Sequence, residues 1–459
     1  MGEPSADYSA GRTSRRHLLR WLIVGCAISL LALTLVALGN HSGMPDLRPE
    51  PLVSRGLPAT AGAVQLEAPT CQGARCVSVD GWASDWNAEG ISVQHDWLMR
   101  VFYGATPPYA APFNSAELPN VYIMGLACPS ATQCVVAAES NIPPGSPSEW
   151  PELGIVTRSR MSFVKRPHAP YLSHPFGVAC GAVGWCVVPI QADARTLVET
   201  YRGSSWSPLV AVPGIAEFDA LACPSSRTCF ALGTGPKGEA LLTVTPSAMT
   251  VQWKVIQHGG IVPSRLACHS AAACVIVGVD KNPGAGANGI LDVGRIAVQT
   301  VSKGRLLPAM DLTRSLYSPS IGTLSCSSDT RCVAGGSDTG YEGVGRAIVL
   351  AEVSGSWSVD RSSLASLNAN GFAAVTDSAC NGQGRCLFSG SYSYEGPTFL
   401  SSLPSGPTRP FLAFESTTGI ERLSNLGAKN DQPGEIVCPA STDCLVWDGS
   451  RLLRVNPIL

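Results

Sequence analysis

The residues with the clearest chemistry in this sequence are cysteines, and they occur in pairs. Sixteen of the 17 cysteines form eight pairs whose members stand five or six positions apart. The odd one, Cys26, lies in an apolar N-terminal segment. Paired cysteines either hold a metal ion or form a disulfide. The eight pairs are Cys71/Cys76, Cys128/Cys134, Cys180/Cys186, Cys223/Cys229, Cys268/Cys274, Cys326/Cys332, Cys380/Cys386 and Cys438/Cys444.

The spacing favours disulfides. Residues that face each other across a β-hairpin have β-carbons about 4 Å apart, which is the distance a disulfide needs. Zinc sites use closer Cys-x-x-Cys pairs with histidine or further cysteine partners, and His269 is the one histidine inside any pair. We therefore expect eight local disulfides, no metal site and no cofactor. Each bridge would add about 2.4 kcal/mol by loop closure and would stiffen a single hairpin.

The elements that position these pairs are strands. Copies such as LACPSATQCVVAA from Leu126 and LACPSSRTCFALG from Leu221 have an apolar strand, a polar turn and a second apolar strand. The pairs recur every 43 to 58 residues, which is the size of a four-stranded propeller blade. No amphipathic helical stretch accompanies them. The sequence predicts an all-β fold, an eight-bladed β-propeller of four-stranded blades; seven blades stay open because the first pair is the least regular.

Two further patterns concern the blades. Trp206, Trp253 and Trp357 recur at one place within their periods, and we expect them to pack between neighbouring blades. Only fifteen residues follow Cys444, too few to complete a blade. We expect a strand near Ala61–Pro69 to supply the missing one, because closing the ring removes exposed sheet edges.

The N-terminal sequence predicts that most of the chain is located outside the cytoplasm. Residues 21–38 form an uncharged apolar run long enough for a transmembrane helix, and Arg12, Arg15, Arg16 and Arg20 precede it. We expect residues 1–40 to be a cytoplasmic tail and signal anchor, 41–60 a Pro-rich stalk, and 61–459 the propeller. The propeller would then be extracytoplasmic at the cell membrane, as eight disulfides require. Cleavage, through a secretory or twin-arginine route (SRRHLLR, residues 14–20), remains an alternative that yields a secreted protein.

Composition and motifs exclude several activities. Charged residues make up 14% of the chain, the net charge is −2, and no basic run follows the N-terminus, which argues against a nucleic-acid partner. Gly-x-Gly-x-x-Gly matches from Gly233 and Gly284 follow cysteine hairpins rather than opening helices, so we interpret them as hairpin loops. No metalloprotease, serine-hydrolase or P-loop motif occurs. A carboxylate pair for glycoside cleavage cannot be chosen without geometry, so we name no catalytic residue and leave enzyme activity open.

One segment is rich in aromatic residues. Trp82, Trp86, Trp97 and Tyr103 stand between Trp82 and Tyr109 beside polar residues. Such aromatics suit stacking on sugar rings or contact with a protein partner, whereas packing within and between blades is the alternative. We take them as candidate ligand-binding residues.

The repeated LxCPSxxxCxxxG pattern resembles the cysteine-containing β-propeller repeats of exported bacterial proteins, within the sialidase-like and photosystem-assembly-factor-like propeller group. The resemblance covers residues 61–459 and implies the fold, but no catalytic motif of that group matches. Only six of the 32 basic residues are lysine, a bias that suggests an actinobacterial source. The expected function is a membrane-anchored, non-catalytic binding or assembly platform for a protein or glycan partner. The alternative is a polysaccharide-active enzyme, a glycoside hydrolase or lyase.

Overall fold

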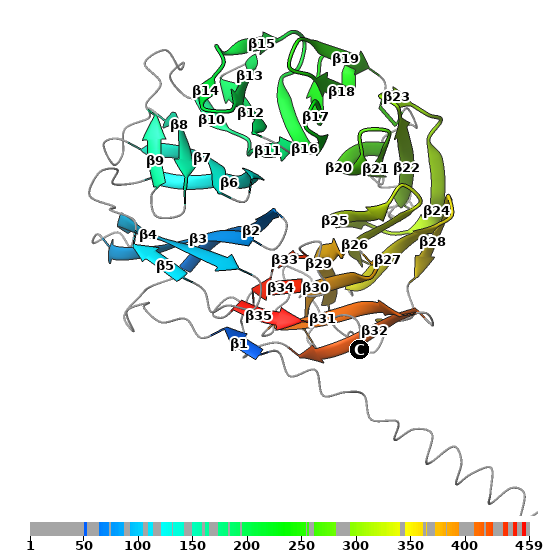
Figure 1. Ribbon diagram of the computed structural model, residues 1–459. Coiled ribbons are helices and arrows are strands. Elements are labelled where there is room, and N and C mark those ends of the chain that lie inside the picture. Colours follow the sequence, from blue (N-terminus) through cyan, green and yellow to red (C-terminus); the bar gives the residue numbers. More distant parts are fainter. Residues whose placement is uncertain are drawn as a thin grey trace, which may run out of the picture. The chain divides into compact units, whose positions relative to one another are not determined.

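The structure is a computed structural model (Figure 1), and its described strands all belong to the unit Pro49–Ile458. The predicted transmembrane segment and Cys26 lie outside the described residues. Among those residues, no helix has the length and hydropathy of a membrane span. The described residues are 50–52, 64–72, 75–86, 92–103, 109–112, 121–130, 132–141, 149–157, 161–164, 173–181, 184–192, 195–253, 255–256, 261–280, 294–339, 345–360, 364, 372–381, 383–393, 408–416, 419–425, 435–438, 444–447 and 452–455.

The described strands form eight antiparallel sheets, numbered here in chain order. Sheet 1 contains β2 (Val64–Gln72), β3 (Arg75–Trp86), β4 (Ser92–Tyr103) and β5 (Tyr109–Pro112). Sheet 2 contains β6 (Val121–Ser130), β7 (Gln133–Asn141), β8 (Glu149–Val156) and β9 (Met161–Val164). Sheet 3 contains β10 (Ser173–Pro175), β11 (Ala179–Gly181), β12 (Trp185–Ala192), β13 (Arg195–Arg202), β14 (Ser205–Trp206) and β15 (Val210–Val212). Sheet 4 contains β16 (Glu217–Ser225), β17 (Thr228–Gly235), β18 (Gly238–Val244) and β19 (Met249–Trp253).

The second four sheets repeat this plan. Sheet 5 contains β20 (Ile261–Ser270), β21 (Ala273–Asp280), β22 (Gly294–Ser302), β23 (Arg305–Leu306) and β24 (Met310–Leu316). Sheet 6 contains β25 (Pro319–Ser328), β26 (Arg331–Thr339), β27 (Gly345–Val353) and β28 (Ser356–Asp360). Sheet 7 contains β29 (Phe372–Cys380), β30 (Cys386–Ser393), β31 (Arg409–Ser416) and β32 (Gly419–Asn425). Sheet 8 contains β33 (Ile436–Val437), β34 (Cys444–Trp447), β35 (Leu452–Val455) and β1 (Glu50–Leu52).

One strand of each sheet contacts its counterparts in both neighbouring sheets, and we call these the inner strands: β2, β6, β11, β16, β20, β25, β29 and β33. Each inner strand contacts the next along the chain, and β33 contacts β2, so that the series closes on itself. Sequential antiparallel sheets joined at their first strands are the architecture of a β-propeller. The prediction of an all-β propeller fold is therefore confirmed.

The last sheet is completed by the N-terminal part of the chain, as predicted, but by a different segment. β1 pairs with β35, with Glu50 opposite Arg454 and Leu52 opposite Leu452. The expected segment, Ala61–Pro69, instead lies largely in β2, the inner strand of sheet 1. The prediction of that position was wrong because the closing strand is only three residues long and contains Pro51. At the outer edge of a sheet a proline removes no ladder hydrogen bond.

The cysteine pairs lie where the inner strand turns into the second strand of each sheet. Directly opposed pairs include Cys180 with Cys186 and Cys380 with Cys386. Cys71 also stands opposite Cys76 in the backbone register, although their side chains are outside the described residues. The seven bridges described are Cys128–Cys134, Cys180–Cys186, Cys223–Cys229, Cys268–Cys274, Cys326–Cys332, Cys380–Cys386 and Cys438–Cys444.

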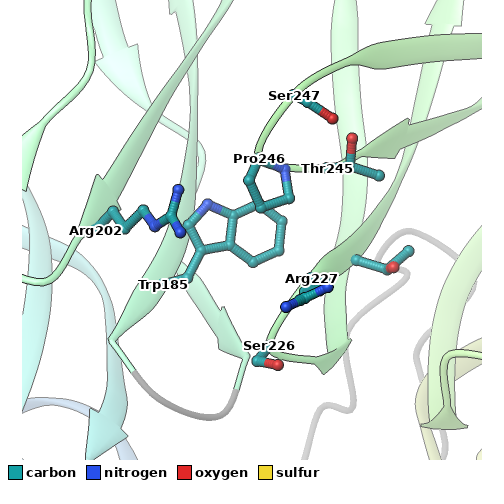
Figure 2. A pocket seen from close by; sticks show the side chains of 8 residues that line it. Trp185, Arg202, Ser226, Arg227, Thr245, Pro246 and Ser247 are labelled. Carbon is teal, nitrogen blue, oxygen red and sulfur yellow. The ribbon is translucent and has the colours of Figure 1, made fainter.

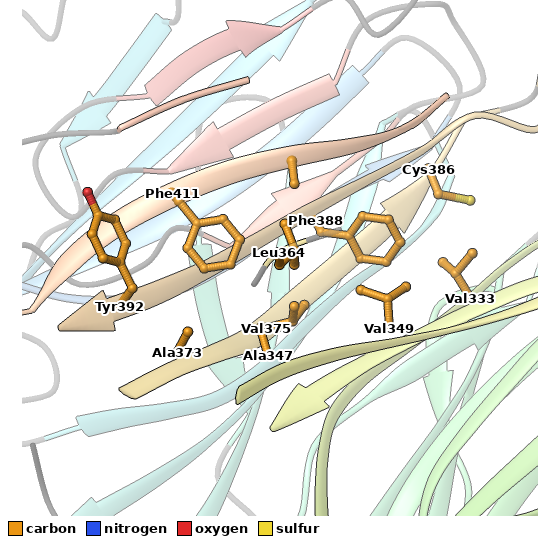
Figure 3. Close-up of a cluster of buried hydrophobic side chains, with 11 residues drawn as sticks. Val333, Ala347, Val349, Leu364, Ala373, Val375, Cys386, Phe388, Tyr392 and Phe411 are labelled. Atoms are coloured by element: carbon orange, nitrogen blue, oxygen red, sulfur yellow. The ribbon is translucent and has the colours of Figure 1, made fainter. Parts of the chain in front are cut away.

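Apolar clusters between consecutive sheets hold the fold together. Figure 3 shows the cluster between sheets 6 and 7, where Val349 of β27 faces Phe388 of β30. Second strands such as β21 are buried on both faces, which explains the unbroken apolar run after each second cysteine. Trp206, Trp253 and Trp357 each pack against a cluster formed by two neighbouring sheets, so their predicted role is confirmed.

Candidate functional site on the inner strands

A bulge recurs in the inner strands three to four residues before the first cysteine. The pairing register shifts between Ile123 and Gly125 in β6, and between Val375 and Asp377 in β29. The same shift occurs in β16, β20 and β25. A bulge leaves one residue unpaired and redirects the side chains beside it. The residue that follows the bulge, three before the first cysteine, is called the inner position below.

The inner position divides the sheets into two groups. Sheets 1 to 4 have only alanine or glycine there, whereas sheets 5 to 8 have residues that can carry charge or donate hydrogen bonds. Polar groups from four consecutive sheets, three of them ionisable, are brought together although they stand about fifty residues apart in the chain. In order of sheet, the residues are Ala68, Gly125, Gly177, Ala220, Arg265, Thr323, Asp377 and Glu435.

Arg265 spans the boundary between sheets 5 and 6. Its Nε donates a hydrogen bond of 2.7 Å to the carbonyl oxygen of Gly322, and its Nη1 donates one of 2.8 Å to the carbonyl of Ser264. Burial lowers the pKa of this guanidinium, and the negative charge of Asp377 opposes that effect. Arg265 is only partly buried, and its Nη2 makes no hydrogen bond within the described part of the chain.

Asp377 joins sheets 6, 7 and 8. Its Oδ2 accepts a 2.6 Å hydrogen bond from the backbone amide of Ile436, and its Oδ1 accepts from the amide of Ser378 at 2.8 Å. Thr323 of sheet 6 donates to Oδ1 at 3.3 Å and shares a 2.8 Å bond with the Ser378 hydroxyl. Burial raises the pKa of the Asp377 carboxyl to about 6, although these hydrogen bonds and Arg265 favour the ionised form.

Glu435 ends the series at the junction of sheets 7 and 8. Burial, and then the negative charge of Asp377, raise the pKa of the Glu435 carboxyl to about 7. Its Oε2 is buried and has no hydrogen-bond partner among the described residues. Two interacting carboxyls with raised pKa values can share a proton near neutral pH. Glu435 thus adds a carboxyl oxygen with unused hydrogen-bonding capacity to the series.

The other half of the ring has a contrasting surface. A β-carbon added at Gly125 would lie 3.0 Å from the amide nitrogen of Val178 and 3.1 Å from the α-carbon of Gly177, so these backbones touch directly. A cavity of about 290 Å³ beside them is lined by apolar side chains of three sheets, including Met124, Phe176 and Leu221. The inner positions are therefore small and apolar in sheets 1 to 4 and polar in sheets 5 to 8.

The residues predicted from sequence to bind a ligand lie on sheet 1, next to sheet 8. Trp82 and Trp86 are on β3, and Trp97 and Tyr103 are on β4. Backbone pairing sets Trp82 opposite Asp96 and Trp97 opposite Gly81. Their side chains are outside the described residues, so ligand binding by these four residues stays a prediction. The inner strands of sheets 1 and 8 do contact each other.

The charged inner positions were missed at the sequence level, although a signal existed. Aligning the eight copies on their first cysteine exposes a column that changes from Ala and Gly to Arg, Thr, Asp and Glu. Among the described side chains, no group of three or more His, Cys, Asp and Glu could hold a metal ion. Of the two Gly-x-Gly-x-x-Gly matches, the first connects β17 to β18 as a hairpin loop, as predicted. The second lies outside the described residues.

Comparisons with known proteins give similarity of fold only. No known protein family matches the sequence, and no curated protein does. Solved structures that resemble the chain include the WD40 β-propeller domain of Doa1, with 9% identity, TM-score 0.38, and coverage of 71% of this chain and 93% of that one. A subtype N11 neuraminidase-like protein (A/flat-faced bat/Peru) shares 12% identity at TM-score 0.38, covering 66% and 92%. The GH74 xyloglucanase from Xanthomonas campestris shares 12% at TM-score 0.39, covering 86% and 66%. Likenesses of this size carry no argument about function.

Proposed function

We propose that this chain is an exported bacterial propeller of eight four-stranded blades, anchored to the cell membrane by residues 21–38. It would serve outside the cytoplasm as a non-catalytic binding platform. Seven described disulfides support an oxidising location, because such bonds do not persist in a reducing cytosol. The order of the sheets and the return of β33 to β2 support the blade number. The anchor rests on the sequence.

One observation carries the proposal for binding: at the inner position, polar side chains occur in sheets 5 to 8 and not in sheets 1 to 4, and two of them are held in place. Arg265 and Asp377 are fixed by bonds to the backbone of the next sheet, so a ligand would meet a surface that is already ordered. Preorganised donors and acceptors lower the entropic cost of binding. Carboxylates and a guanidinium suit the hydroxyl groups of a glycan, and the predicted aromatic residues of sheet 1 would stack on its rings.

A specific observation favours the second candidate, a polysaccharide-active enzyme. Asp377 and Glu435 are neighbouring carboxyls whose pKa values are raised to about 6 and about 7, and glycoside hydrolases use a carboxyl pair with a raised pKa on the acid. However, both oxygens of Asp377 already accept hydrogen bonds from backbone amides. A carboxyl whose two oxygens are held by amides suits a role in positioning other groups better than nucleophilic attack on a sugar. Binding is therefore the better supported function.

The test uses the full chain, produced with its disulfides and purified in detergent. It would be screened on a glycan array and by capture of proteins from the envelope of the source organism, beside the Glu435→Gln variant. We expect wild type to bind a glycan and the variant to bind it at least about tenfold more weakly, because a charged acceptor is lost. Capture of a partner protein without binding of any glycan would mean that the platform binds a protein instead. Turnover of a polysaccharide that Glu435→Gln abolishes would establish the enzyme instead.

A further inference from the structure

A separate pocket lies between sheets 3 and 4, at the turns that carry the disulfides. It has a volume of about 590 Å³, which is within the range of ligand sites. Trp185, the first residue of β12, and Arg202, the last of β13, come from sheet 3. Arg227 and Thr245 come from two turns of sheet 4. None of these residues belongs to the inner positions described above.

The charge of this pocket is entirely positive. Its described lining contains two arginines and no carboxylate; hydroxyl groups of serine and threonine make up much of the rest. Within the described part of the chain, neither the Arg202 nor the Arg227 guanidinium has a hydrogen bond or an ion pair. Figure 2 shows the two arginines on different sides of the Trp185 indole, with Thr245 and Ser247 beyond it. The pocket thus offers two solvent-exposed guanidinium groups, without protein partners among the described residues, around an aromatic side chain.

The backbone around the pocket is fixed. Trp185 is 2% exposed and belongs to the apolar cluster between sheets 3 and 4, and it directly precedes Cys186 of a disulfide. The turn before it is held to the turn after β13 by a 2.8 Å bond from the amide of Gly203 to the carbonyl of Gly184. Both glycines have positive φ, +66° and +73°, which other residues rarely adopt. The arginines therefore project from ordered turns.

Trp185 distinguishes this pair of sheets from the others. The residue before the second cysteine is Trp only here; in the other seven pairs it is Arg, Gln, Thr, Ala or Asp. Between sheets 5 and 6, at the corresponding turns, Ser270 donates a 2.9 Å hydrogen bond to Asp329. That contact joins the two turns and places a carboxylate there. At sheets 3 and 4 the described side chains instead keep two guanidiniums available to a ligand.

We infer that this pocket binds an acidic sugar unit of a glycan, a uronic acid. Guanidinium groups recognise carboxylates through paired, charge-assisted hydrogen bonds, and serine and threonine hydroxyls match sugar hydroxyls. The site extends the proposed platform with a second contact, on different sheets and of opposite charge to Glu435. It rests on the proposed function only for the general class of ligand, and its test is independent of the inner strands.

The experiment measures binding of tri-galacturonate to the full chain by calorimetry at low salt. Its fully methyl-esterified form serves as the neutral control ligand. We expect wild type to bind the acid form, with affinity that falls as salt rises, and the ester at least about tenfold more weakly. Arg202→Gln and Arg227→Gln should each weaken binding of the acid form about tenfold, and the double variant more.

A control variant distinguishes this pocket from a general effect of surface charge. Arg305→Gln removes an exposed arginine at the comparable turn of sheet 5, and it should bind tri-galacturonate like wild type. Equal binding of acid and ester, wild-type affinity in the double variant, or absence of binding in wild type would each overturn the inference. So would binding of inorganic phosphate without binding of tri-galacturonate.

Discussion

The two halves of the inner-strand series use the same position in different ways. In sheets 2 to 4 the inner position is Gly125, Gly177 or Ala220, and at Gly125 the neighbouring backbones touch. In sheets 5 to 7, the side chain at that position bonds to the next sheet. The repeated features of the sequence therefore build the sheets, and the residues that differ between repeats at the inner position provide the polar groups. At the inner position of sheet 2, therefore, added side-chain volume should destabilise the fold. In sheets 5 to 7, loss of the side chain's hydrogen bonds should do so.

The largest expected effect on stability comes from replacing the inner-position residue of sheet 2 with the residue found there in sheet 6, a threonine. Gly125→Thr would place side-chain atoms against the backbone of Gly177 and Val178, which cannot move aside easily because it belongs to the neighbouring inner segment. Overpacking of this kind costs about 3 kcal/mol. Urea unfolding should show this loss in the free energy of unfolding. A change below about 0.5 kcal/mol, the range of ordinary surface substitutions, would mean that the backbones are not in close contact.

A smaller effect depends on pH and belongs to the second half. The pKa of Glu435 is raised to about 7, so the folded state holds a proton that the unfolded chain releases. The stabilisation that this protonated carboxyl provides is fully present below the pKa of Glu435 in the unfolded chain. It is lost as pH rises through about 7. Glu435→Gln should therefore raise the free energy of unfolding by on the order of 2 kcal/mol at pH 8, after allowance for solvent screening.

At pH 4 the same variant should match wild type, because the carboxyl is then protonated. The control is Glu217→Gln, which changes an exposed carboxyl on the inner strand of sheet 4; as a surface substitution it should change the free energy of unfolding by less than about 0.5 kcal/mol. Unfolding followed by fluorescence from pH 4 to 8 measures both. If the difference between Glu435→Gln and wild type stays constant over this range, the carboxyl does not have the environment described.

The smallest effect tests the hydroxyl that links sheets 6 and 7. Thr323→Val keeps the shape of the side chain but removes its bonds to Asp377 and Ser378. The expected loss is about 1 kcal/mol in the free energy of unfolding, the usual net value of such a bond. Thr250→Val is the control and should be close to neutral, because Thr250 is an exposed residue of β19 whose hydroxyl makes no hydrogen bond within the described part of the chain. A neutral Thr323→Val would mean that polarity at this position does not stabilise the second half.

Much of the scaffold could be predicted from the sequence, because the pattern of a cysteine pair flanked by apolar strands occurs eight times. Cysteine spacing predicted the hairpins, and the Trp positions predicted packing between sheets. β1 was missed because three residues, Glu50 to Leu52, form a strand only through the partner that tertiary structure provides. The site was missed for the opposite reason. Arg265 and Asp377 look like isolated surface charges until the fold brings sheets 5 to 7 together, close enough for the two charges to interact.

The most direct test of the account labels carboxyl groups with carbodiimide and glycine ethyl ester, with and without the glycan that the array identifies. Glu435 of the second half and Glu217 of the first are compared by mass spectrometry. The account predicts that ligand lowers the labelling of Glu435 and leaves that of Glu217 unchanged. Protection of Glu217 with no change at Glu435 would contradict it.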